Sequence, residues 1–261
     1  NGVLGMVELL LATSLSDKQR HFSHTIRDSG IALLHVINEI LDFSKIEANK
    51  VDLEQAEFEL LPLVRSLGDL FHEPLQRKGV RWHCEVDKAL PLRWCGDAGR
   101  LRQILLNLVG NAVKFTERGE IALSLQRHDG DGRHVTMKVV VRDTGIGIPP
   151  DKQESVFESF SQGSIEINRK YGGTGLGLAI VRRLIIILGG NISLSSKIGQ
   201  GTVFSFSLEF REGTKKTAVN EPLDDALLAT KKILLVEDNK INQMITRRLL
   251  EKKQVVCEVA E

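Results

Sequence analysis

Two glycine-containing runs carry the residues most able to do chemistry. The first run, residues 143–149, reads Asp-Thr-Gly-Ile-Gly-Ile-Pro. It follows a segment in which apolar and polar residues alternate, and this alternation predicts a half-buried strand that ends at Asp143. The second run, residues 172–179, reads Gly-Gly-Thr-Gly-Leu-Gly-Leu-Ala and leads into an apolar helical pattern. Glycines let main-chain N–H groups approach a phosphate, and a helix N-terminus attracts anions, so the two runs together predict a nucleotide pocket.

Each glycine run has a simpler explanation. A glycine pair after a strand is more often a turn than a ligand site, so neither run is specific alone. Two common phosphate loops are excluded. The sequence has no G-x-x-x-x-G-K-[ST] run, and residues 173–178 break the G-x-G-x-x-G pattern at its last position. No strand pattern directly precedes the second run, which argues further against a dinucleotide-binding fold.

A row of polar residues lies on a helix predicted over residues 97–113. Its members follow one another at steps of four, four and three, and therefore share one face: Gln103, Asn107, Asn111 and Lys114. Such a row is usually a solvated face. However, asparagine inside a helix costs roughly 0.5 kcal/mol relative to alanine. Neutral amide oxygens are also suitable ligands for a hard cation such as Mg²⁺ whose other ligands are phosphates and water. We therefore predict that this row faces a ligand.

Composition limits the class of protein. The chain has 261 residues, 42% apolar and 26% charged, with a formal net charge of +1. This is ordinary for a globular protein and gives no reason to expect a nucleic-acid partner. The three cysteines lack the number and spacing of a disulfide framework or zinc site, and fit a reducing compartment. No apolar run approaches the ~20 residues of a membrane span. Because the chain begins at Asn1, we expect targeting and membrane segments to lie upstream.

The first fifty residues predict a helical hairpin. Apolar residues recur at helical spacing over residues 1–12 and again over residues 17–48, and Ser16 or Asp17 could cap the second helix. Two helices joined by a short loop pack antiparallel. A lone hairpin cannot bury both flanks of its apolar stripe, so we expect a homodimer that forms a four-helix bundle. The second helix carries His21, His24 and His35, which we interpret as part of a polar helix face.

Residues 51–211 predict a two-layer α/β sandwich, which makes the whole chain α+β. Strand patterns at residues 81–86, 120–126, 135–141, 192–196 and 202–210 mix with helical patterns at 62–78, 97–113, 150–160 and 176–188. Polar residues 161–171 suggest a mobile lid. A polar linker follows over residues 212–230. Residues 231–261 then contain a buried-strand pattern that ends in Glu237 and Asp238, and a second strand pattern at 255–259. This tail is too short for a doubly wound domain, so we expect it to be disordered or docked.

Five motifs in one order resemble those of sensor histidine kinases. Residues 107–116, Asn-Leu-Val-Gly-Asn-Ala-Val-Lys-Phe-Thr, look like the family's asparagine box. Residues 143–147 resemble the first glycine box, and residues 157–160 the phenylalanine box. Residues 173–177 resemble the second glycine box, and residues 199–202 the last box. Residues 1–50 resemble the dimerisation and histidine-phosphotransfer hairpin, residues 51–211 the ATP-binding domain of histidine kinase and gyrase type, and residues 231–261 the start of a receiver domain.

The resemblance implies a role for each matching position. Asn111 would ligate Mg²⁺ with support from Asn107, and Asp143 would accept a hydrogen bond from the adenine amino group. Gly145 and Gly147 would let the base approach closely, and Thr202 would lie near it. The phosphates of ATP would be held by Lys114, Lys170, Gly173, Thr174, Gly175, Leu176 and Gly177. Glu237 and Asp238 would form the incomplete Mg²⁺ site of the receiver.

The resemblance also implies a reaction, in which the γ-phosphoryl group of ATP passes to a histidine and then to a receiver aspartate of the same or another chain. The family's acceptor run, S-H-E-[IL]-R-T-P-[LM]-N, is missing, and residues 1–6 look like the residues after it. We therefore expect the acceptor upstream of Asn1, in the cytoplasmic portion of an inner-membrane sensor. Two alternatives stay open: a related ATPase that does not phosphorylate histidine, and a dimeric scaffold with a silent nucleotide pocket.

Overall fold

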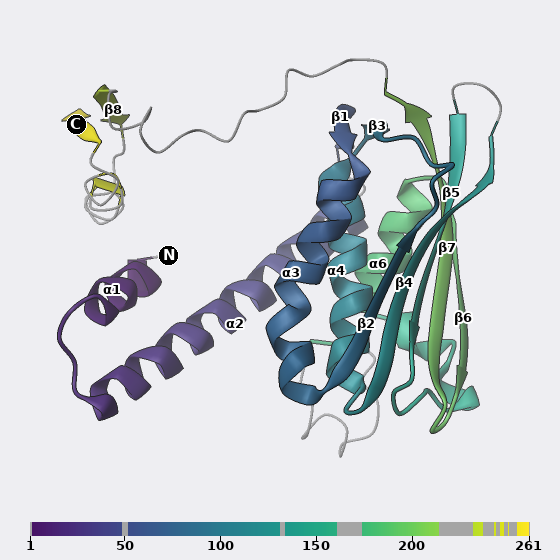
Figure 1. Ribbon diagram of the computed structural model, residues 1–261, viewed down its shortest axis with the longest axis horizontal. Helices are drawn as coiled ribbons and strands as arrows, with labels where there is room; N and C mark the ends of the chain where they lie inside the picture. Colours follow the sequence, from purple (N-terminus) through teal and green to yellow (C-terminus); the bar gives the residue numbers. More distant parts are fainter. Residues whose placement is uncertain are drawn as a thin grey trace. The chain divides into compact units, whose positions relative to one another are not determined.

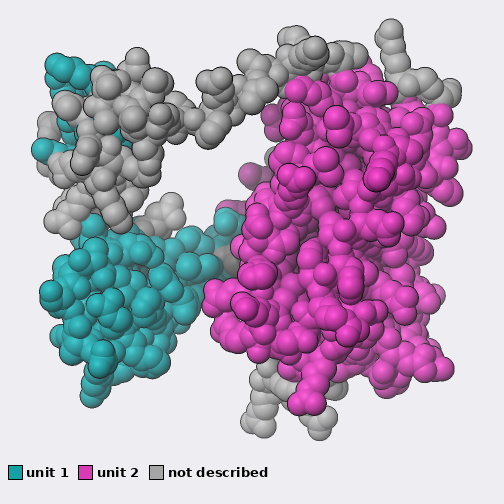
Figure 2. Space-filling model, in the orientation of Figure 1, with its two compact units in different colours: residues 1–38, 216–261 teal, residues 39–215 magenta. Residues whose placement is uncertain are grey.

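The computed structural model describes residues 2–48, 52–130, 134–160, 174–213, 232–236, 243, 246–247, 250 and 255–260. The chain divides into two compact units (Figure 2). The first contains residues 1–38 and 216–261, and the second contains residues 39–215. In the described part of the chain, no helix combines the length and the apolar character needed to cross a membrane.

The first unit contains the predicted helical hairpin. Helix α1 spans Gly2–Leu11, and α2 spans Asp17–Glu47, so the last turns of α2 belong to the second unit. The two helices approach closely at Gly30, where a Cβ atom would lie 2.7 Å from Leu4 Cδ2. Ser16 begins α2 as expected: its backbone N–H donates to Gln19 Oε1 at 3.0 Å, and the Gln19 N–H reaches Ser16 Oγ at 3.4 Å. This reciprocal pair is a capping box.

The apolar stripe of α2 is exposed in the single chain. Six of its large side chains keep 42–60% of their surface accessible: Phe22, Ile26, Leu33, Ile37, Ile40 and Leu41. A contiguous apolar stripe of this kind on a helix marks a surface that another element covers.

The described residues of the tail form a pair of strands. Strand β8 (Lys232–Val236) pairs in parallel with β9 (Val256–Ala260), and Lys232 lies opposite Val256. Both strands predicted in this segment are therefore confirmed, but the burial predicted for the first is wrong, because Leu234 and Val236 are exposed. Parallel strands need a crossover connection, and described residues between them, such as Thr246 and Leu250, are helical. Glu237, Asp238 and the predicted linker from residue 214 onward lie outside the described residues.

The second unit is a sheet covered on one face by helices, as predicted (Figure 1). The strand order is β1-β3-β7-β5-β4-β2, with β6 also paired to β7. The strands are β1 (Ala56–Glu59), β2 (Val80–Val86), β3 (Arg93–Gly96), β4 (Gly119–Asp129), β5 (His134–Asp143), β6 (Asn191–Lys197) and β7 (Gly201–Glu212). Helices α3 (Leu60–Lys78), α4 (Ala98–Phe115) and α6 (Gly177–Ile187) form the second layer.

The core lies between these two layers. Strand β5 buries alternate side chains. Four of them are at most 1% exposed: Val135, Met137, Val139 and Val141. The apolar face of α4 packs against them through Leu101, Ile104, Leu105 and Leu108, none of which is exposed. Full burial of such a side chain contributes about 1.5–3 kcal/mol. Asp97 fixes the start of α4, because its Oδ1 accepts a hydrogen bond from the Arg100 N–H at 2.8 Å.

The helix predicted over residues 150–160 is wrong. The chain instead forms two short 3₁₀ turns, η1 (Pro150–Lys152) and η2 (Ser155–Phe157). Gln153 draws this segment toward the sheet, because its Nε2 donates to the carbonyl groups of Ile148 at 3.0 Å and Ser196 at 2.9 Å. Phe157 is an apolar anchor as expected and packs edge-on against Phe204. Phe160 is not such an anchor, since 65% of its surface is exposed.

Candidate functional site

The carboxylate of Asp143 lies at the end of β5, as the alternating pattern predicts. Its strand partner in β7 is Thr202, and both residues are nearly buried. Asp143 Oδ1 accepts a hydrogen bond from the Gly145 N–H at 2.8 Å. Burial raises the pKa of Asp143, while hydrogen bonds from the backbone N–H groups of Gly145 and Thr202 act to lower it. A buried acid with a raised pKa at a strand end is a candidate binding group.

The glycines after Asp143 are required by the protein's own backbone. A Cβ atom at Gly145 would lie 2.5 Å from the Phe115 carbonyl oxygen, and one at Gly147 would lie 2.2 Å from the Lys197 carbonyl oxygen. Gly147 also has a φ of +73°, which side chains rarely adopt. Packing alone therefore explains these two glycines, and their close approach to a base stays a prediction.

Gly147→Ala is expected to lower the free energy of unfolding by about 2–4 kcal/mol, because it adds a clash with Lys197 to the strain of a positive φ. Gly199→Ala is the matched control. Gly199 has the same φ of +73°, but a Cβ atom there would meet nothing within 4 Å, so a loss of only about 1 kcal/mol is expected. Urea unfolding of both variants measures the difference. Equal losses would show that the backbone at Gly147 moves away from Lys197 easily.

A hydroxyl group that sequence reasoning missed supports the base of this site. Ser196 Oγ accepts from the Ile148 N–H at 2.8 Å, donates to the Gly201 carbonyl at 2.9 Å, and lies 2.9 Å from Thr202 Oγ1. It thereby ties the first glycine run to the β6–β7 turn. No local pattern marks Ser196, because it is one of three serines within four residues of a strand.

The polar row on α4 divides into two parts. Gln103 faces protein rather than a ligand: its Nε2 donates to Asp42 Oδ2 at 2.8 Å. The prediction that the row as a whole faces a ligand is therefore wrong for this residue. Asn107 lies beside the N-terminus of α6, where a Cβ atom at Gly177 would be 3.3 Å from Asn107 Oδ1. The structure thus brings the asparagine row and the second glycine run together.

Lys114, the last residue of the row, is half-buried on the final turn of α4. Burial lowers the pKa of Lys114, and the nearby carboxylate of Glu39 acts to raise it. The Lys114 Nζ atom also lies 5.0 Å from the centre of the Phe115 ring. Asn111 stands between Asn107 and Lys114 on the same face and is half-buried.

The second glycine run forms the entry to α6. Gly175 has a φ of +74°, Leu176 is buried, and α6 begins at Gly177. Thr174 Oγ1 accepts a hydrogen bond from the Leu176 N–H at 3.2 Å. The helix N-terminus therefore opens beside Asn107, in the arrangement that suits an anion. Lys170, Gly173 and the predicted lid at residues 161–171 lie outside the described residues.

These groups fit a nucleotide with a divalent cation. Asp143 offers a buried acceptor for an amino group, and Lys114 and the N-terminus of α6 offer positive charge for phosphates. The amide oxygens of Asn107 and Asn111 are the neutral donors that Mg²⁺ accepts alongside phosphate and water.

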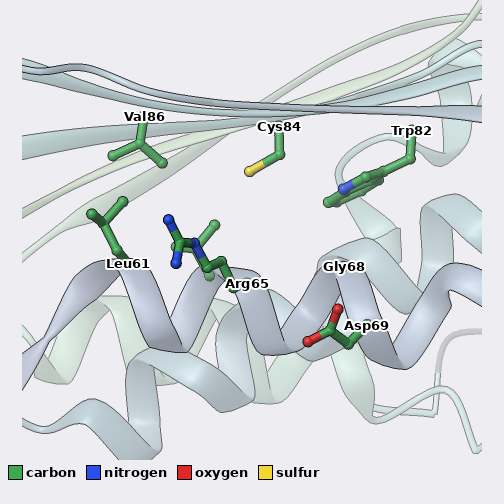
Figure 3. Close-up of a pocket in the computed structure, with 8 residues that line it drawn as sticks. Leu61, Arg65, Gly68, Asp69, Trp82, Cys84 and Val86 are labelled. Atoms are coloured by element: carbon green, nitrogen blue, oxygen red, sulfur yellow. The ribbon is translucent and has the colours of Figure 1, made fainter.

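A separate hollow of about 480 Å³ lies between α3 and β2 (Figure 3). Trp82, Cys84 and Val86 point into it from the strand, and Leu61, Arg65 and Asp69 border it from the helix. None of the predicted site residues that the structure describes lines it. Partial burial raises the pKa of the Cys84 thiol, which disfavours the reactive thiolate. We therefore assign the chemistry to the strand-end site and not to this hollow.

Comparison with known proteins defines the class. Residues 96–212 match the family described as histidine kinase-, DNA gyrase B- and HSP90-like ATPase. Residues 1–49 match the His kinase A (phospho-acceptor) domain. The chain therefore combines a histidine kinase phospho-acceptor domain with an ATPase domain of the histidine kinase type, and the relatives that it matches are named as sensor or signal transduction histidine kinases.

Individual relatives agree with this assignment. Hybrid signal transduction histidine kinase L of Dictyostelium discoideum is 40% identical over 81% of this chain and 12% of its own length. Signal transduction histidine-protein kinase BarA of Escherichia coli is 37% identical over 96% of this chain and 27% of its own length. The crystal structure of full-length ShkA in complex with AMPPNP is 36% identical, with a TM-score of 0.66, over 99% of this chain and 52% of that one. The chain thus spans only about a quarter or less of the first two relatives.

Proposed function

We propose that this chain binds Mg²⁺ and ATP at the strand-end site and transfers the γ-phosphoryl group to a histidine. The observation that carries the proposal is the juxtaposition of Asn107 with the N-terminus of α6, within one unit that also holds the buried carboxylate of Asp143. A base-recognising acid, a metal-ligating amide row and an anion-binding helix end are the three parts that ATP needs. The family assignment and the relative bound to AMPPNP support the same ligand.

Each side chain has a stated task in this proposal. Asp143 accepts a hydrogen bond from the adenine amino group, and Thr202 lies beside the base. Lys114, Lys170 and the backbone from Gly173 to Gly177 hold the phosphates. Asn111, supported by Asn107, holds Mg²⁺, which when bound neutralises charge on the phosphate oxygens. The protein's contribution to phosphoryl transfer is then mainly positioning and electrostatic stabilisation.

The reaction exchanges one bond to phosphorus for another. An imidazole nitrogen of the acceptor histidine bonds to the γ-phosphorus while the bond from that phosphorus to the β,γ-bridging oxygen breaks, which releases ADP, and the imidazole loses a proton. We propose that this histidine precedes Asn1 and that phosphate passes onward to the aspartate of a receiver domain. Glu237 and Asp238 would bind Mg²⁺ in such a domain, and the parallel pair of β8 and β9 is compatible with its start.

The exposed apolar stripe of α2 supports the dimeric part of the proposal. Phe22, Ile26 and Leu33 lie on this stripe and are each about half exposed or more in the single chain. A second copy of the hairpin would cover them in a four-helix bundle. The homodimer would bring the acceptor helix of one chain near the ATP site of its own or the partner chain.

Phosphoryl transfer is tested with ATP labelled at the γ-phosphate. The full-length protein is expected to gain label that acid removes and base does not, which is the behaviour of phosphohistidine. The 261-residue chain and its His21→Gln and His24→Gln variants serve as controls, and all three are expected to stay unlabelled. Label on the 261-residue chain that His24→Gln abolishes would place the acceptor on α2 and contradict the proposal. ATP hydrolysis by the full-length protein without any phosphohistidine would favour an ATPase.

A further inference from the structure

A carboxylate from α2 occupies the region assigned to the phosphates. Thr174 Oγ1 donates a hydrogen bond of 2.6 Å to Glu39 Oε2. The other oxygen, Glu39 Oε1, lies 3.8 Å from the position of a Cβ atom at Gly177. The Glu39 charge also acts on Lys114 and raises its pKa against the effect of burial. One anion is therefore in reach of three positions to which the proposed function gives phosphate contacts.

Neighbouring contacts hold Glu39 in this place. Asp42, one turn further along α2, lies 3.4 Å from Arg100 Nη1 and 2.8 Å from Gln103 Nε2 on α4. The next residue, Phe43, packs edge-on against Phe160, with 6.2 Å between ring centres. Ile46 is 1% exposed and belongs to the core of the second unit. The last turns of α2 are thus held by the contacts of Asp42 with α4 and by the burial of Ile46 in the core, and these contacts fix the backbone from which the Glu39 side chain extends.

We infer that Glu39 is a competing anion that must leave the second glycine run before the phosphates of ATP can bind there. Two anions cannot share the Thr174 hydroxyl and the Lys114 charge without strong repulsion, because little water screens charges at a half-buried site. The inference rests on the proposed function, since it assumes that phosphates bind beside Thr174 and Gly177. It adds that α2, which is continuous with the hairpin, contributes an autoinhibitory contact to the ATP site.

A different role for the same carboxylate makes the opposite prediction. A glutamate beside Asn107 could ligate Mg²⁺ together with the amide oxygens. In that case removal of the Glu39 charge would weaken ATP binding in Mg²⁺ and leave binding in EDTA unchanged. Competition predicts instead that removal of the charge strengthens ATP binding in both conditions.

The test compares wild type, Glu39→Gln and Glu47→Gln in the 261-residue chain. Glutamine keeps the size of glutamate and an acceptor for Thr174, so the change removes the charge alone. Glu47 is an exposed acid two turns further along α2, so Glu47→Gln controls for net charge. Calorimetric titrations with ATP and with adenosine, each in Mg²⁺ and in EDTA, give the dissociation constants. Thermal unfolding monitored by circular dichroism confirms that each variant is folded.

Glu39→Gln is expected to lower the dissociation constant for ATP by about tenfold, the effect of a modest change in binding free energy. Its affinity for adenosine, which has no phosphates, should not change, and Glu47→Gln should match wild type. ATP binding by Glu39→Gln in the absence of binding by wild type would also support the inference. Equal ATP affinities in all three proteins, or weaker binding by Glu39→Gln in Mg²⁺ only, would overturn the inference and leave the proposed function standing. No ATP or adenosine binding by any of the three would overturn both.

Discussion

Asp143→Asn is expected to weaken ATP binding by on the order of 100-fold, close to 3 kcal/mol, the upper end for a hydrogen bond to a charged group. In wild type the Gly145 N–H donates a hydrogen bond to Asp143 Oδ1 at 2.8 Å. In the variant, the single side-chain oxygen of asparagine is needed for this hydrogen bond. The amide NH₂ of asparagine would then face the adenine amino group, and two donors would oppose each other. Calorimetric titration of ATP measures the loss. An affinity within a few-fold of wild type would show that Asp143 does not recognise the base.

The same variant should not lose stability in the absence of nucleotide. Burial raises the pKa of Asp143 in the folded chain, so the folded state favours the protonated acid. The associated stability is fully present below the ordinary aspartate pKa of about 3.9 and is lost as the pH rises through the raised folded pKa. Above that window wild type carries an ionised buried carboxylate, and asparagine removes this cost.

Thermal unfolding across pH checks this second expectation. The melting temperature of Asp143→Asn should equal or exceed that of wild type at neutral pH, and the difference should move against the variant as the pH falls toward about 4, near the ordinary aspartate pKa. A variant that is clearly less stable at neutral pH would show that the carboxylate is mainly a structural group. The loss of ATP binding could not then be attributed to the base contact alone.

Asn111→Ala is expected to reduce the affinity for ATP about 10- to 100-fold in Mg²⁺ and to change it little in EDTA, because the variant loses an amide oxygen that holds the metal. Gln103→Ala is the matched control on the same row of α4. The Gln103 side chain donates to Asp42, so its loss should leave the difference between Mg²⁺ and EDTA intact. An equal loss for Asn111→Ala in both conditions would contradict a metal role and indicate a packing role.

Local patterns were enough to predict most elements of the fold. The alternation in β5 gave the strand, its buried face and the position of Asp143 at its end. The helical spacing over residues 97–113 predicted α4 and its polar row, whereas the capping role of Asp97 is seen only in the structure. The helix expected over residues 150–160 rests on Phe157 and Phe160, whose three-residue spacing is that of one helix face. The chain forms turns instead, because Gln153 Nε2 donates to the carbonyl groups of Ile148 and of Ser196 on β6.

Contacts between distant segments could not be predicted in this way. Glu39 and Thr174 are separated by 135 positions, and no periodicity in either segment relates them. Ser196 acts through hydrogen bonds to Ile148, Gly201 and Thr202 that only the folded sheet creates. Gln103 was assigned to the ligand because spacing gives the face of a helix and not the element that covers it.

Calorimetric titration of ATP into the 261-residue chain, first in Mg²⁺ and then in EDTA, measures whether the strand-end site binds the nucleotide together with the metal. We expect saturable binding of one ATP per chain in Mg²⁺ and markedly weaker binding in EDTA. A chain that is folded by circular dichroism and binds no ATP in either condition, for both wild type and Glu39→Gln, would contradict this expectation.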